Sequence, residues 1–189
     1  ARKARPESTH ATFLGLARDV PPELLPPAIA IEIAEHLSDT LCGPDAEPLL
    51  RFLACRTGTP ECPRALAALG LAAASRGDTQ EALAIFETFE QDDTASTLLP
   101  RILETHADIL LGQGRHAEAV PILERLLKSP GLKGAAAARA LCRIGEAQEA
   151  LGQFEKAMPY YQRVYVMYGG HPDPAAKAYL ASARIFERL

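Results

Sequence analysis

One glycine recurs at a nearly constant interval along this chain. Gly77 stands in Ser-Arg-Gly-Asp-Thr-Gln-Glu-Ala, Gly114 in Gly-Gln-Gly-Arg-His-Ala-Glu-Ala, and Gly152 in Ala-Leu-Gly-Gln-Phe-Glu-Lys-Ala. The interval is 37 residues from Gly77 to Gly114 and 38 residues from Gly114 to Gly152. Each glycine separates two stretches whose apolar residues follow helical spacing. A period of this size predicts helix hairpins stacked into a solenoid, an architecture that usually presents a binding surface.

The residues around these glycines resemble the tetratricopeptide repeat. With the turn glycine counted as position 15, that family places a large residue at position 4, leucine at 7, glycine at 8, an aromatic at 11, alanine at 20, an aromatic at 24, alanine at 27 and proline near 32. The corresponding residues are Leu66, Leu69, Gly70, Ala73, Ala82, Phe86 and Phe89 in the first repeat; Leu103, His106, Ala107, Leu110, Ala119, Leu123, Leu126 and Pro130 in the second; Leu141, Ile144, Gly145, Gln148, Ala157, Tyr161, Val164 and Gly169 in the third; and Tyr179, Ser182, Ala183 and Phe186 in a fourth first helix.

The resemblance covers residues 63–189 and implies an all-α fold, a right-handed α-solenoid of antiparallel helix hairpins. Three features depart from the family pattern: His106 at the leucine position, Gln148 at the aromatic position 11, and a period above the usual 34 residues. A fourth turn glycine would fall just past the last residue. We therefore expect either a chain cut in mid-repeat or a final helix that serves as the cap.

Physical reasons support the alignment. Small residues at positions 8 and 20 let the two helices of a hairpin approach closely. The turn glycine is expected to end the first helix in a left-handed conformation. After Gly77, Asp78 is expected to cap the next helix, with Glu81 completing a capping box. Pro121 and Pro159 share position 22, which we expect within about the first turn of the second helix, where a missing N–H costs little.

Three segments are expected. Residues 1–20 hold a frayed leader at 1–7 and a short helix at 9–20. Residues 21–62 form a degenerate hairpin of helices 27–41 and 46–56, separated by the breaker Gly43-Pro44, which caps the solenoid because terminal repeats are often atypical. Residues 63–189 hold three repeats and a final helix. Their helices are expected at 63–76, 79–91, 97–113, 116–128, 134–151 and 154–168, and from 174 onward.

Composition limits the function classes. The chain is 48% hydrophobic and 23% charged, as in ordinary globular proteins. Its net charge of −4 argues against general nucleic-acid binding. No stretch reaches the roughly 18 apolar residues that a membrane span needs. Abundant alanine and arginine are typical of GC-rich bacterial genomes. The compartment, cytoplasmic or periplasmic, stays open.

The cysteines Cys42, Cys55, Cys62 and Cys142 form no CxxC pair, and the histidines are scattered, so no metal site is expected. Cys55 and Cys62 bracket a short stretch and allow two interpretations. They close a disulfide in an oxidising compartment, or both are small buried apolar residues. The sequence also shows no glycine-rich phosphate loop and no catalytic constellation. We therefore expect neither a cofactor nor an enzyme.

One pattern suggests a binding site. Position 2 of each first helix is basic, and in the family this position points toward the concave groove. A cation at a helix N-terminus opposes the helix dipole, so local stability does not explain the pattern. The hypothesis is a basic ladder that anchors an acidic or C-terminal peptide, and the alternative is a solvated edge balanced by Glu104, Asp108, Glu146 and Glu149. The ladder residues are Arg64, Arg101, Arg139 and Lys177, with Arg143 at position 6 one turn from Arg139.

The arginine pair resembles half of the carboxylate clamp with which some tetratricopeptide proteins hold chaperone tails. The other half is missing, because Ala67, Leu71 and Thr105 replace the clamp's lysine and asparagines. Chaperone-tail binding is therefore not expected. A second candidate surface is the aromatic stretch from Tyr160 to Tyr168. Its alternatives are packing between repeats and a dimer contact.

These observations favour a binding module that docks an extended peptide or helix of another protein in its concave groove. Two alternatives remain. One is a structural or assembly module of a larger bacterial envelope complex, with self-association. The other is the regulatory arm of a longer multidomain protein. The sequence does not identify the partner.

Overall fold

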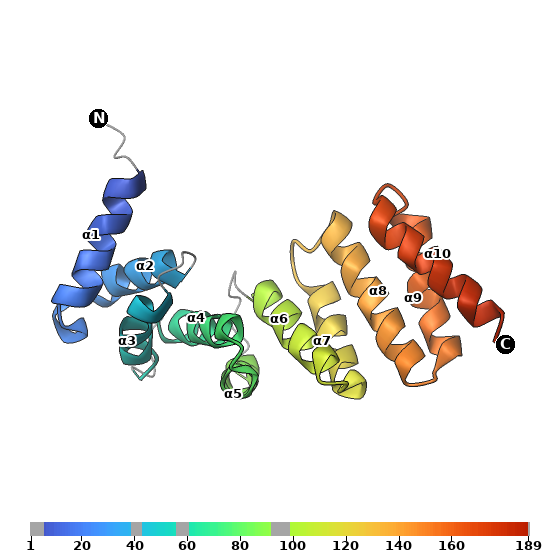
Figure 1. Ribbon diagram of the computed structural model, residues 1–189, viewed down its shortest axis with the longest axis horizontal. Helices are drawn as coiled ribbons and strands as arrows, with labels where there is room; N and C mark the ends of the chain where they lie inside the picture. The colour runs from blue at the N-terminus through green and yellow to red at the C-terminus, as the bar shows by residue number, and fades with distance from the viewer. Residues whose placement is uncertain (1–5, 39–42, 56–60, 92–98, 189) are drawn as a thin grey trace. The chain divides into compact units, whose positions relative to one another are not determined.

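The computed structural model describes residues 6–38, 43–55, 61–91 and 99–188 (Figure 1). It divides into two compact units, residues 1–98 (unit 1) and 99–189 (unit 2). All regular structure in the described ranges is helical. Within each unit, consecutive helices pack on each other as antiparallel hairpins, so the predicted all-α fold is confirmed. None of these helices combines the length and apolar character needed to cross a membrane.

Unit 1 packs its helices around an aliphatic core. The core comes mainly from α2 and α3, which contact each other and α4. Its fully buried large side chains are Ile31, Ile33, Leu49, Leu50 and Leu53. The helices are α1 (Pro6–Asp19), the 3-10 turn η1 (Pro22–Leu24), α2 (Pro27–Ser38), α3 (Gly43–Ala54), α4 (Glu61–Arg76) and α5 (Thr79–Gln91).

Unit 2 is a row of hairpins in which each helix packs on the next one along the chain, and α8 also contacts α10 (Figure 1). Its fully buried side chains include Leu103, Leu123, Leu126 and Tyr161. The helices are α6 (Leu99–Gly112), α7 (His116–Lys128), α8 (Gly134–Ala150), α9 (Phe154–Met167) and α10 (Pro172–Phe186).

The three turn glycines have the conformation expected of them. Their φ angles are +84° at Gly77, +74° at Gly114 and +71° at Gly152. Each turn closes with the same two backbone hydrogen bonds: the N–H of Gly77 donates to Ala74 and that of Asp78 to Ala73, and both bonds recur at the other two turns. This is the Schellman arrangement, which satisfies the last carbonyls of the first helix. The repeat spacing therefore marks a real structural period.

The predicted capping box is half formed. The Asp78 carboxylate accepts a hydrogen bond of 3.0 Å from the Glu81 backbone N–H, as an N-cap should. The Glu81 carboxylate does not accept the second hydrogen bond of the box, from the Asp78 backbone N–H. That carboxylate is bound by Arg51 and Arg76, at 2.9 and 3.2 Å, and the Asp78 N–H is already used in the turn. Glu47 accepts from the same two arginines, at 2.7 and 3.1 Å, so four charges from α3, α4 and α5 form a closed ring.

Several predicted helix limits were wrong. Gly43 and Pro44 do not break a helix, because α3 begins at Gly43, and α1 begins at Pro6 inside the expected leader. Pro121 and Pro159 are each the sixth residue of their helix, beyond the first turn. The carbonyls four residues earlier, which a proline cannot supply with an N–H, belong to the exposed residues Ala117 and Glu155, where water can take the place of the missing donor.

Cys55 and Cys62 are both free thiols. Cys62 is buried, and its Sγ–H donates to the Ala54 carbonyl at 3.3 Å. Cys55 is exposed, so the buried interpretation is right for Cys62 and wrong for Cys55. Cys42 lies outside the described residues.

Candidate functional site

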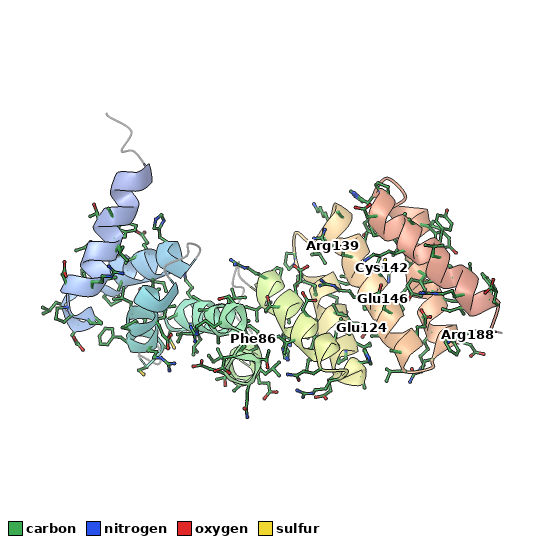
Figure 2. All side chains as sticks on the ribbon, viewed as in Figure 1. Phe86, Glu124, Arg139, Cys142, Glu146 and Arg188 are labelled. Atoms are coloured by element: carbon green, nitrogen blue, oxygen red, sulfur yellow. The ribbon has the colours of Figure 1, made fainter. Side chains whose placement is uncertain are left out.

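A pocket of about 720 Å³ lies between α8 and α10 in unit 2. We call it the basic pocket. One wall is a single face of α8, where Arg139, Cys142 and Glu146 follow one another one turn apart (Figure 2). The other wall is the start of α10 and the residue before it. It contributes His171, Pro172, Asp173, Pro174, Ala176 and Lys177.

Three of the five predicted ladder residues meet at this pocket. Arg139, Arg143 and Lys177 all line it, although Lys177 comes from a different hairpin than the two arginines. Arg101 lies on α6 and Arg64 on α4 in unit 1, and neither lines the pocket.

The dipole argument does not hold for two of these cations. Arg139 and Lys177 are each the sixth residue of their helices, whereas the dipole acts mainly over the first turn. Their charge therefore costs little in local helix stability.

Arg143 is already engaged within the molecule. Its guanidinium lies 2.7 Å from the Asp108 carboxylate and 3.5 Å from that of Glu104, both on α6. Burial raises the pKa of Asp108, and the charge of Arg143 opposes that rise. Arg143 thus ties α8 to α6, as the balanced-edge alternative expects. By contrast, Arg139 and Lys177 form no ion pair within the part of the chain that the structure describes.

The pocket is mixed in charge rather than purely basic. Glu146 and Asp173 bring carboxylates to it, while alanine and proline supply apolar wall. A bound group therefore meets donors, acceptors and apolar surface together.

Cys142 offers no nucleophile there. Its Sγ–H donates to the Pro174 carbonyl at 3.3 Å. Burial, with the charge of Glu146, raises the pKa of the thiol to about 11. The thiol is therefore protonated at neutral pH, and the pocket is better suited to binding than to covalent chemistry.

His171, Asp173, Pro172 and Pro174 line the pocket but were not among the predicted site residues. For the α8 wall, the sequence did carry a signal: Arg139, Cys142 and Glu146 have the spacing i, i+3, i+7, which puts them on one face of a helix. This spacing does not indicate that the start of α10 packs beside that face of α8. In the described ranges, no group of three His, Cys, Asp or Glu side chains is placed to hold a metal ion.

The aromatic stretch of α9 is mainly structural. The Tyr161 ring is in the core, and its hydroxyl donates to Glu149 at 3.1 Å. Tyr160 donates to Glu124 of α7 at 2.7 Å, and the Tyr165 ring stacks on Tyr179 of α10 at 4.4 Å between centroids. Packing between repeats is therefore right for Tyr160 and Tyr165, whereas the Tyr161 ring packs against α8 of its own repeat.

A sequence model of the tetratricopeptide repeat matches residues 44–96 and 105–172. The chain belongs to the tetratricopeptide repeat family. The first matched segment contains all of α4 and α5, the second contains all of α7, α8 and α9, and proteins of this family bind other proteins. A comparison with curated proteins gave no match.

Solved structures share the fold. A MamA structure (AMB-1) has 16% sequence identity and a TM-score of 0.68, covering 90% of this chain and 88% of its own. BtubC (BKLC) from P. vanneervenii has 15% identity and a TM-score of 0.64, covering 95% and 81%. The TPR-like repeats of a putative kinesin light chain from Podosopora anserina have 19% identity and a TM-score of 0.60, covering 89% and 91%. At these identities the likeness concerns the fold alone.

Proposed function

We propose that this protein is an interaction scaffold whose basic pocket binds an extended, acidic peptide segment of a partner protein. The family supports protein binding in general. The observation that carries the finer proposal is the pair Arg139 and Lys177, which line one pocket from two helices and have no ion pair in the described part of the chain. Two such cations favour a carboxylate-bearing ligand.

The mixed lining favours a peptide over a small inorganic anion. A phosphate or sulfate would gain from Arg139 and Lys177 but would be repelled by Glu146 and Asp173. A peptide carries carboxylates for the cations and backbone N–H groups for the acidic side chains. It also has apolar side-chain groups that can pack against the alanine and proline residues of the pocket wall.

Arg143 would act as a fixed charge at the edge of this site. Since Asp108 and Glu104 already neutralise it, a ligand carboxylate must compete with them to reach it. We therefore assign the main contacts to Arg139 and Lys177. Arg64 and Arg101 remain proposed contacts on the strength of their shared repeat position.

A synthetic peptide array tests this function. It would present decapeptides with increasing numbers of Asp and Glu, each with a free and an amidated C-terminus. The proteins compared are the wild type, Arg139→Glu/Lys177→Glu, and a control with the same charge change on α9, Lys156→Glu/Arg163→Glu, whose two side chains are exposed.

We expect wild-type binding to rise with acidity. A charged hydrogen bond contributes roughly 1.5–3 kcal/mol, so losing two should weaken binding by about 100-fold or more. The control should bind like the wild type. Equal binding by all three proteins, or no dependence on peptide acidity, would contradict the proposal.

A further inference from the structure

A second pocket lies in unit 2, where α8 packs against both α7 and α9 (Figure 1). Its volume is about 620 Å³, and its lining shares no residue with that of the basic pocket. We call it the glutamine pocket. Glu124 comes from α7 and Gln148 from α8, and the remaining wall belongs to α9. The α9 residues are Glu155, Lys156, Pro159, Tyr160 and Arg163.

Gln148 contributes a buried polar side chain to this pocket. The residue is only 8% exposed, and its Oε1 has no hydrogen-bond partner within the described chain. The first two repeats have the apolar residues Ala73 and Leu110 at this repeat position. A buried acceptor without a donor destabilises the folded state, so packing does not explain a glutamine here. Since the terminal torsion of glutamine is broad, the amide can turn toward the pocket and accept an N–H from a ligand.

Two cations line the α9 wall. Lys156, Tyr160 and Arg163 have the spacing i, i+4, i+7, which puts them on one face of the helix. Lys156 and Arg163 are both exposed, and neither forms an ion pair with any residue that the structure describes. An anionic group of a ligand would therefore find two charged donors on this wall.

The α7 wall carries the opposite charge. The Tyr160 hydroxyl donates to Oε1 of Glu124 at 2.7 Å, and this bond joins α9 to α7 at the pocket. The other carboxylate oxygen of Glu124 accepts no hydrogen bond from the described residues, so it can accept one from an ammonium group of a ligand. Glu155, near the start of α9, adds a second carboxylate to the lining.

These charges limit the chemistry of the ligand. A phosphate would be attracted by the two α9 cations but repelled by Glu124 and Glu155, and a polyamine would meet the reverse. A zwitterion with an ammonium and a carboxylate group matches both signs, and its ammonium group also offers an N–H to Gln148. The pocket volume lies within the range of about 300–1,000 Å³ that is typical of small-molecule sites.

We propose that the glutamine pocket binds a small zwitterion. Its carboxylate contacts Lys156 and Arg163. Its ammonium group contacts Glu124 and the Oε1 of Gln148. Free α-amino acids and short peptides with uncapped ends share this chemistry. The site goes beyond the proposed binding of an acidic segment and does not depend on it, because the two pockets have no residue in common.

A thermal-shift screen followed by calorimetry tests the ligand class. The screen would use the free amino acids and a set of uncharged dipeptides and tripeptides, each at about 10 mM, because a ligand that binds the folded state raises the melting temperature. Each ligand that binds would be compared with its N-acetylated and C-amidated forms. Each cap removes one charge and should weaken binding by about 10-fold or more.

Binding in either group of ligands that is lost on capping supports the proposal, and the group that binds identifies the source of the zwitterion. No shift with any ligand, or equal binding of the capped forms, would overturn it.

Substitutions locate the site. Gln148→Met should weaken binding by about 10-fold while the protein stays folded, because the change removes a buried acceptor that has no donor. Lys156→Gln/Arg163→Gln should weaken it by about 100-fold or more. Arg139→Gln/Lys177→Gln makes the same charge change in the basic pocket and should bind the zwitterion like the wild type. Binding that survives in both of the first two variants, or that is lost only in the third, would overturn the proposal.

Discussion

The Tyr161 ring fills the space that a side chain on Gly145 would need. A Cβ atom at Gly145 would lie 2.6 Å from Cε1 of that ring, closer than real carbon contacts allow. The ring is only 1% exposed and has little room to move. The first repeat has the same relationship, because a Cβ atom added at Gly70 would lie 2.5 Å from Cε1 of the Phe86 ring. In the second repeat the smaller Leu123 occurs with Ala107, so the residue at position 24 limits the residue at position 8.

Gly145→Ala should therefore destabilise the protein. Alanine in a helix interior would ordinarily gain about 1 kcal/mol over glycine. Overpacking against a fixed ring costs about 1–3 kcal/mol, and a contact this short falls in the upper part of that range. We expect a net loss of about 1–2 kcal/mol in the free energy of unfolding, measured by urea denaturation followed by circular dichroism.

A double-mutant cycle supplies the control. Tyr161→Leu alone should destabilise by leaving a cavity, but Gly145→Ala/Tyr161→Leu should lose less than the sum of the two single changes. Additive losses would show that the ring and the glycine are not coupled.

The turn glycines give a matched pair of substitutions. Gly114 has a φ of +74°, whereas Gly112 has an ordinary helical φ, and neither has an atom within 4 Å of an added Cβ. Gly114→Ala should cost about 1 kcal/mol, because a left-handed conformation disfavours a Cβ. Gly112→Ala should be neutral or stabilising by up to about 1 kcal/mol. Thermal unfolding would compare the two, and equal effects would contradict the assigned turn geometry.

Gln148 is a buried polar residue at a position where the family has an aromatic. It is 8% exposed, and within the described chain its Oε1 has no hydrogen-bond partner. Gln148→Met keeps the approximate volume and removes that acceptor, so it should stabilise the protein by about 1 kcal/mol. The reverse change at the same repeat position, Leu110→Gln, should destabilise it by about 2 kcal/mol or more. A lower melting temperature for Gln148→Met would contradict the assignment of the Gln148 Oε1 as an acceptor without a partner.

The thiols should differ sharply in reactivity. Cys55 is exposed, whereas Cys142 is buried, and burial raises the pKa of its thiol to about 11. A maleimide reagent at pH 7 should label Cys55 rapidly and Cys142 only after denaturation. Peptide mass spectrometry of the labelled protein measures both sites. Fast labelling of Cys142 in the native state would contradict the packing of α8 on α10.

The sequence was enough to predict the repeat and its internal contacts. The glycine period located the turns because a left-handed residue at a helix end strongly selects glycine. The apolar positions located the helix faces because burial requires helical spacing. Both are local signals, and they recur at Gly77, Gly114 and Gly152.

What the sequence could not predict depends on contacts between repeats. Arg143 was grouped with the other ladder cations because it shares a helix with Arg139. The sequence named Asp108 and Glu104 among four carboxylates that could balance the ladder, but it did not show which cation they would pair with. Both belong to the preceding hairpin, and only the packing of α8 on α6 brings them to Arg143. The basic pocket likewise exists because the start of α10 lies against α8. Cys55 is exposed although cysteine is usually buried, because it follows the last residue of α3 and a helix end can lie at the surface.

The most direct test of the binding proposal is a charge swap followed by fluorescence anisotropy. The protein would be titrated into a labelled acidic decapeptide that binds the wild type. It would also be titrated into a matched decapeptide in which each Asp and Glu is replaced by Lys. We expect the wild type to prefer the acidic peptide and Arg139→Glu/Lys177→Glu to prefer the lysine peptide. An unchanged preference in that variant would show that the peptide does not contact Arg139 and Lys177, and it would contradict the proposed binding site.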